Sequence, residues 1–177
     1  MSFIEVFKDR FKFCSCDITI HIVPNTTHAI KRFKFYDDLT RGDCYAVKTG
    51  GISNITVLDF DSLDSYIQFC KNVPDFESYF TVKTRRGFHV YFEYNKDVKS
   101  GNNVLTFVDV RNDPVKLHGG MFYPNVNCPP SSYTINGELF TYEFLGGEIK
   151  PIPEYFFTRL ANRPNEISKL ANKLHNA

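Results

Sequence analysis

The 177-residue sequence contains no tryptophan, only two methionines and no long run of apolar residues. A helix that crosses a bilayer needs about 20 consecutive apolar residues, and the sequence offers no such segment. The N-terminal residues also lack the apolar core of a secretory signal peptide. We therefore expect a protein that is not secreted, has no membrane partner and resides in the cytoplasm.

Cysteine is scarce, and the five residues are odd in number and irregularly spaced: Cys14, Cys16, Cys44, Cys70 and Cys128. This pattern argues against a disulfide framework and fits reduced thiols. Cys14 and Cys16, followed by His21 and His28, raise the alternative of a zinc site. The single residue between the two cysteines is shorter than the usual zinc spacing, and alternation along a strand explains the pair better.

A large excess of charge is also absent, because the net charge is only +1. The basic residues are nevertheless grouped and interleaved with aromatic residues, as in Arg10-Phe11-Lys12-Phe13 and Arg32-Phe33-Lys34-Phe35. Such interleaving suits a groove that holds phosphates and stacks bases. Solvated faces of amphipathic elements explain any one cluster equally well. The candidate nucleic-acid contacts are Lys31, Arg32, Lys34 and Arg85.

Hydrophobic periodicity predicts an α+β chain in which strands outnumber helices. Alternating or continuous apolar runs between turn residues indicate strands at 17–23, 44–47, 54–60, 79–83, 88–94, 105–110 and, as a hairpin turning at Asn136-Gly137, 133–144. Apolar spacing and capping residues indicate helices at 2–7, 64–72, 153–160 and 164–174. Segment 29–39 is ambiguous. The length allows one domain, or two small lobes that share a core.

The most informative stretch is the apolar run 55–60, which ends in Asp59 and Asp61. Alternate side chains of a strand point to the same face, so the two carboxylates should project together while Leu58 and Phe60 are buried opposite them. Two such carboxylates repel each other unless a cation lies between them, and Mg²⁺ or Mn²⁺ prefers oxygen ligands. The alternative is that the pair only ends a strand at a solvated turn.

Two later strands also carry polar residues at regular positions. In the strand expected at 88–94, His89 lies on the face opposite Phe88 and just beyond a basic turn that contains Lys83 and Arg86. In 107–113, Asp109 and Arg111 point the same way. His89 alone could be a structural histidine, and Asp109 with Arg111 could be only a local ion pair.

Taken together, these residues suggest a site that handles a metal-bound triphosphate. Asp59, Asp61 and Asp109 would clamp two divalent ions that bridge the phosphates and activate a 3′-hydroxyl. The charge on the phosphates would be offset by His89, Lys83, Arg86 and Arg111.

The ordered motifs resemble those of the archaeo-eukaryotic primase superfamily, in its primase-polymerase branch. They are Leu58-Asp59-Phe60-Asp61, then Gly87-Phe88-His89, then Val108-Asp109-Val110-Arg111. The flanking segments 49–54, 84–92, 109–113 and 129–131 also resemble that branch, and the similarity covers roughly residues 45–145. It is nearest to the N-terminal primase module of primase-helicases from large DNA viruses and mobile elements. Two departures are Asn54, where glycine is usual, and a longer segment at 114–128, which bears on the roles of Arg111 and Ser131.

The resemblance implies a primase fold, with an RRM-like catalytic half packed on a smaller α/β half within residues 1–160. From the residues themselves we expect a C-terminal helix within 161–177, which could also begin a linker to a further domain. The resemblance also implies template-directed transfer of NTPs or dNTPs on single-stranded DNA, with Mg²⁺ or Mn²⁺, at a nucleoid or viral replication site. Asp59, Asp61 and Asp109 would bind metal, and the nucleotide would contact His89, Arg111, Lys83, Arg86, Ser53 and Ser131. No G-x-x-x-x-G-K-[ST] loop is present, so a replicative helicase partner would lie in a further domain or a separate protein.

Two other functions remain open on the sequence. A non-catalytic nucleic-acid-binding replication module of the same fold would keep the basic aromatic surface without needing all three acids. A metal-dependent nuclease could use the same acids, although additional His or Glu ligands near the motifs would then be expected.

Overall fold

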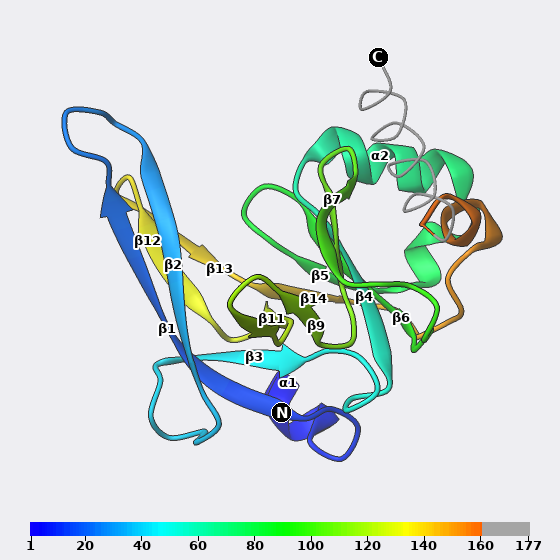
Figure 1. Ribbon diagram of the computed structural model, residues 1–177, viewed down its shortest axis with the longest axis horizontal. Coiled ribbons are helices and arrows are strands. Elements are labelled where there is room, and N and C mark those ends of the chain that lie inside the picture. Colours follow the sequence, from blue (N-terminus) through cyan, green and yellow to red (C-terminus); the bar gives the residue numbers. More distant parts are fainter. Residues whose placement is uncertain (161–177) are drawn as a thin grey trace.

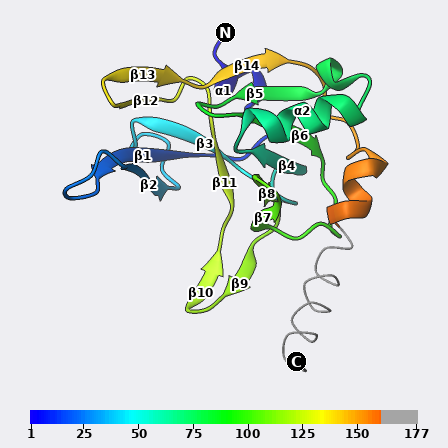
Figure 2. The same cartoon turned by 90° about the horizontal axis from the view of Figure 1, so that it is seen from above.

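A computed structural model of the chain describes residues 1–160, which form an α+β structure built on two antiparallel sheets (Figures 1 and 2). The helix expected at 164–174 lies outside the described residues. Within the described range, no helix is both long enough and apolar enough to span a bilayer.

The N-terminal residues 1–48, together with one strand from later in the chain, form a short helix and a four-stranded sheet. Helix α1 (Phe3–Phe7) begins as predicted at Ser2, whose Oγ accepts a hydrogen bond from the Glu5 N–H at 3.2 Å. The sheet has the order β11 (Asn125–Cys128), β3 (Cys44–Lys48), β1 (Phe13–Ile22), β2 (Ala29–Tyr36). Strand β1 begins well before the predicted position 17. Its first residues are buried on both faces and therefore show no alternation of polar and apolar side chains.

The second sheet has six strands in the order β14 (Glu143–Gly146), β5 (Phe80–Lys83), β6 (Phe88–Glu93), β4 (Ile55–Phe60), β8 (Val108–Arg111), β7 (Gly101–Leu105). Every neighbouring pair is antiparallel. The strand predicted at 105–110 is wrong at its start, because Leu105 ends β7 and a turn at Phe107, with φ of +57°, separates it from β8. Helix α2 (Leu63–Asn72) connects β4 towards β5 by way of a 3₁₀ turn (Phe76–Ser78).

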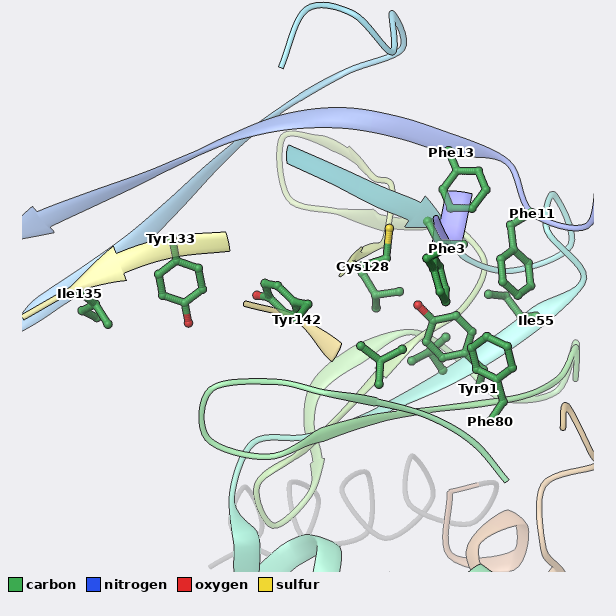
Figure 3. Close-up of a cluster of buried hydrophobic side chains, with 14 residues drawn as sticks. Phe3, Phe11, Phe13, Ile55, Phe80, Tyr91, Cys128, Tyr133, Ile135 and Tyr142 are labelled. Carbon is green, nitrogen blue, oxygen red and sulfur yellow. The ribbon is translucent and has the colours of Figure 1, made fainter. Parts of the chain in front are cut away.

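Both faces of the six-stranded sheet are covered. One face packs against α1 and the four-stranded sheet through an aromatic-rich cluster that includes Phe3, Phe13, Phe80 and Tyr91 (Figure 3). The other packs against α2 and the helical segment 154–160 (Figure 1). The central strands are therefore buried on both sides, which is why Tyr91 is fully buried although it lies on the same face of β6 as the polar His89.

Two hairpins project from the sheets. The predicted turn at Asn136-Gly137 joins β12 (Ser132–Ile135) to β13 (Glu138–Thr141), with positive φ at both residues as a tight hairpin requires. A hairpin not predicted from the sequence, β9 (Val115–Leu117) with β10 (Gly120–Phe122), occupies the segment that is long relative to the primase pattern (Figure 2). Phe122, the last residue of β10, lines a cleft between the two sheets.

Candidate active site

The sequence motifs meet in one row across the six-stranded sheet. In the register of the sheet, Asp59 on β4 lies directly opposite His89 on β6 and directly opposite Asp109 on β8. Side chains of directly paired residues point to the same face, with their Cβ atoms about 5 Å apart. Asp61 follows at the end of β4, where its N–H donates to the Phe107 carbonyl at 2.8 Å. Residues far apart in the sequence thus share one surface.

The three carboxylates converge closely enough to share a cation. One oxygen from each of Asp59, Asp61 and Asp109 lies within 4.8 Å of the other two, and all three residues are half-buried. A set of carboxylate oxygens at this separation has the chemistry that Mg²⁺ or Mn²⁺ requires. The residues therefore fit a divalent metal, in agreement with the sequence-based prediction.

Two of the acids already have cationic or donor partners within the protein. His89 Nε2 lies 3.4 Å from Asp59 Oδ1, and Arg111 Nη2 donates to Asp109 Oδ2 at 3.1 Å. The Asn103 N–H donates to Asp109 Oδ1 at 2.6 Å. None of these three contacts involves Asp61, whose pKa is raised by burial and by the other two acids and only partly lowered by Arg86. The repulsion in the cluster therefore falls mainly on Asp61.

The pKa values of Asp59 and Asp61 move in opposite directions. Burial, followed by the charges of Asp59 and Asp109, raises the pKa of Asp61 to about 7. Burial would also raise the pKa of Asp59, but His89, with Arg111 and Lys31 further off, holds it below its usual value. Carboxyl groups whose environments separate their pKa values are typical of functional sites.

The acids lie in a cleft of about 320 Å³ between the two sheets, here called the acidic cleft. Its walls carry the acids together with Lys31, Arg85, Arg86, His89 and Arg111. The same walls include residues that the sequence reasoning did not select, namely Phe33, Phe35, Thr84, Phe122, Tyr123, Asn125, Val126, Asn127 and Tyr142. Phe33 and Phe35 belong to the basic and aromatic run noted in the sequence, whereas the role of the others depends on which strand faces which across the two sheets.

His89 lines the acidic cleft but is itself almost fully buried. Only 5% of the residue is exposed, and its ring stacks near that of Tyr142, with the centroids 6.2 Å apart. Its Nδ1 is buried and has no hydrogen-bond partner among residues 1–160. A buried polar atom without a partner is rare and costly, so this nitrogen is available to a ligand or an ordered water.

Several predicted site residues do not reach the acidic cleft. Ser53 is buried, and its Oγ accepts a hydrogen bond from the Lys12 N–H at 2.9 Å. Ser131 is also buried, and its Oγ bonds to both the N–H and the carbonyl of Tyr45. Both hydroxyls therefore tie backbone segments together. The structure does not bring these two serines to the predicted nucleotide site.

Three of the basic residues predicted for the site, Lys83, Arg32 and Lys34, lie on strand faces that point away from the acidic cleft. Val82 pairs with His89, so its neighbour Lys83 points to the opposite face of the six-stranded sheet. On β2, Lys31 lines the acidic cleft, whereas Arg32 and Lys34 do not. Arg32 pairs with Thr19 and Lys34 with Asp17, on the outer face of the β1–β2 ribbon.

Residues of the flanking motifs position the strands and loops that carry the site. A Cβ on Gly87 would lie 1.7 Å from the Phe60 carbonyl oxygen, so only glycine lets the basic loop Thr84–Gly87 approach the end of β4. Asn112 is fully buried; its amide donates to the carbonyls of Asn95 and Val98, and its Oδ1 accepts from Thr56. Asn54 has a φ of +55°, a left-handed backbone conformation that asparagine adopts more readily than most residues.

No family model, curated protein or solved structure matches this chain. Its functional interpretation therefore depends on the geometry and chemistry of the acidic cleft.

Proposed function

We propose that the chain is a primase-polymerase, a metal-dependent nucleotidyltransferase that joins NTPs or dNTPs to a 3′-hydroxyl on a single-stranded DNA template. The observation that carries the proposal is the convergence of Asp59, Asp61 and Asp109. Their carboxylate oxygens lie within 4.8 Å of one another, in a cleft that is also lined by lysine and arginine side chains. Isolated acidic clusters are common. Two acids in register with a histidine, with a third acid just beyond them and a basic loop in the same cleft, form a more specific arrangement.

The acids are the residues that would hold Mg²⁺ or Mn²⁺. A bound divalent ion would neutralise phosphate charge and favour ionisation of the attacking hydroxyl. The raised pKa of Asp61 supports this assignment, because three carboxylates so close together are under mutual repulsion that a cation relieves.

The arginine and lysine side chains of the acidic cleft would bind the triphosphate. Arg85 and Arg86 come from the β5–β6 loop, which is fixed at Thr84, whose N–H donates to the Gly87 carbonyl at 3.0 Å. Arg111 and Lys31 approach from the other walls. Guanidinium groups bind phosphate oxygens in a bidentate manner. His89 follows the basic loop by two residues and lies opposite Asp59 in the sheet, where it would contact a phosphate next to the metal-binding acids.

The arrangement of the sheet is compatible with the catalytic half of a primase. Strands β5-β6-β4-β8, with α2 between β4 and β5, follow an RRM-like order, and the three resembling motifs fall on β4, β6 and β8. One departure is that the connection from β6 to β8 carries strand β7 rather than a helix. The four-stranded sheet would correspond to the smaller half.

The test is an incorporation assay with labelled NTPs or dNTPs, Mg²⁺ or Mn²⁺, and a single-stranded template. We expect template-dependent products from the native chain and none from Asp59→Asn. The exposed Asp97→Asn is the matched control and should retain activity. A shortened template would instead indicate a nuclease. DNA binding with neither reaction would indicate a non-catalytic replication module, and either result would overturn the proposal.

A further inference from the structure

Exposed aromatic rings line one side of the acidic cleft. Phe33 and Phe35 on β2 are 41% and 40% exposed, and their ring centroids lie 6.0 Å apart with planes only 17° from parallel. Tyr123, just after β10, is 66% exposed. None of the three belongs to either buried cluster. We call these three residues the aromatic wall. Rings that add nothing to the core but remain in water are typical of binding surfaces.

The aromatic wall connects the acidic cleft to a second hollow. This second cavity has a volume of about 440 Å³ and mostly apolar walls that include Ile52, Pro114 and Pro124. Phe35, Tyr123 and Asn125 line both hollows. A ligand that leaves the acidic cleft over Phe35 therefore enters a cavity of the size and character that accept a planar base.

The two faces of β2 differ in chemistry. Lys31, Phe33 and Phe35 alternate on the cleft face, and the Lys31 Nζ lies 4.8 Å from the ring centroid of Tyr133 and 3.2 Å from its hydroxyl. A fixed cation followed by exposed rings along one strand is the combination that single-stranded nucleic acid requires, since the cation meets phosphate and the rings meet bases.

We propose that the aromatic wall is the path of the single-stranded template, with unpaired bases stacked on Phe33 and Phe35 and one base inserted in the cavity beyond Phe35. The proposal rests on the proposed function, which supplies the template, and adds the surface that binds it. It also reverses the expectation for Arg32 and Lys34, which lie on the outer face of β2 and make no template contact.

The geometry selects a single strand over a duplex. Bases in a duplex strand are stacked about 3.4 Å apart and hide their faces from the protein. The rings of Phe33 and Phe35 are 6.0 Å apart, so they cannot each stack on one of two successive bases that are only about 3.4 Å apart. Bases that contact both rings must therefore be separated from one another, as they are in an extended strand.

The absence of tryptophan from the chain makes a direct test simple. Phe35→Trp introduces a single tryptophan on the aromatic wall, and Ile30→Trp introduces one on the outer face of the same strand, where Ile30 is 39% exposed. Both are titrated with oligo(dT) in EDTA and without nucleotide. We expect strong quenching of the Phe35→Trp emission, because stacked bases quench indole, and little change for Ile30→Trp.

A second measurement gives the contribution of each ring to the affinity for oligo(dT). Phe33→Leu and Phe35→Leu should each weaken oligo(dT) binding on the order of 10-fold, as the loss of one stacking ring does elsewhere. The double variant Arg32→Ala, Lys34→Ala should bind at moderate salt as the native chain does. Both rings are substantially exposed, so the variants should retain the native thermal midpoint, which is measured alongside.

The outcomes separate this proposal from the proposed function. Normal oligo(dT) binding by both leucine variants, or equal quenching of the two tryptophans, would overturn the template path. Quenching by a dNTP but not by oligo(dT) would overturn it as well and assign the wall to the incoming nucleotide. Selective quenching by oligo(dT) without any nucleotide incorporation would keep the surface and overturn the polymerase.

Discussion

Asp59 and Asp109 are direct cross-strand partners on the antiparallel strands β4 and β8. Like charges directly opposite each other destabilise a sheet, and the added proximity of Asp61 increases the repulsion. His89 and Arg111 offset part of it, through contacts of 3.4 Å to Asp59 and 3.1 Å to Asp109. The remaining electrostatic cost is what a divalent cation would relieve.

Replacing Asp61 should stabilise the metal-free protein. Its pKa is raised from 3.8 to about 7 on folding, so between these pH values the folded state keeps a proton that the unfolded state has lost. The free energy of unfolding should therefore fall as pH rises through this range. Since Asp61 is only half-buried, solvent screening reduces the effect to on the order of 1 kcal/mol.

Urea unfolding at pH 5 and pH 8 in EDTA measures this effect. Asp61→Asn should be more stable than the native chain at pH 8 and should lose part of the decline between the two pH values. An identical pH dependence in both proteins would show that Asp61 ionises normally.

Divalent metal should reverse the penalty. Millimolar Mn²⁺ or Mg²⁺ should raise the thermal midpoint, because a ligand that binds only the folded state stabilises it. The increase should be larger at pH 8 than at pH 6, since metal competes with the proton on Asp61. Asp109→Asn should show little metal-dependent shift, whereas Asp97→Asn should shift as the native chain does. A metal response that survives in Asp109→Asn would place the ion elsewhere.

His89 should act on the nucleotide more than on the template. It is 5% exposed at the floor of the acidic cleft and lies 3.4 Å from Asp59 Oδ1. His89→Ala should reduce kcat/KM for the nucleotide on the order of 10²-fold, as the loss of one preorganised electrostatic contact does. Oligo(dT) affinity, measured without nucleotide, should be unchanged. An unaltered KM and kcat would exclude His89 from the reaction.

Arg86 and Lys83 provide a matched pair of basic residues from one hairpin. Arg86 lines the acidic cleft, whereas Lys83 points to the other face of the sheet. Arg86→Ala should lower nucleotide incorporation on the order of 10-fold through a lost charged hydrogen bond, and Lys83→Ala should leave it unchanged. Equal losses in steady-state incorporation assays would show that position in the sheet does not decide the role.

The sequence predicted best where the signal was local. The apolar run ending at Asp59, the spacing of α2 and the turn at Asn136-Gly137 each gave the correct element. The convergence of the acids was also predicted, and it arises because β4 and β8 are antiparallel, so that the end of β4 lies beside the start of β8.

What could not be predicted depended on long-range pairing. Strand β2 is an edge strand whose two faces are both largely exposed, so its residues show no simple alternation. Ser53 and Ser131 fit a family pattern, yet their hydroxyls bind the backbones of distant segments, Lys12 and Tyr45. Which face of a strand meets the acidic cleft follows from sheet register, and this decided the positions of Lys83, Arg32 and Lys34.

The most direct test of the proposed active site is anomalous diffraction from crystals soaked with Mn²⁺ and a non-hydrolysable nucleoside triphosphate. We predict manganese peaks at bonding distance from Asp59, Asp61 and Asp109, with the triphosphate between them and the Arg85-Arg86 loop. Manganese bound away from these three carboxylates, or a triphosphate outside the acidic cleft, would contradict the assignment.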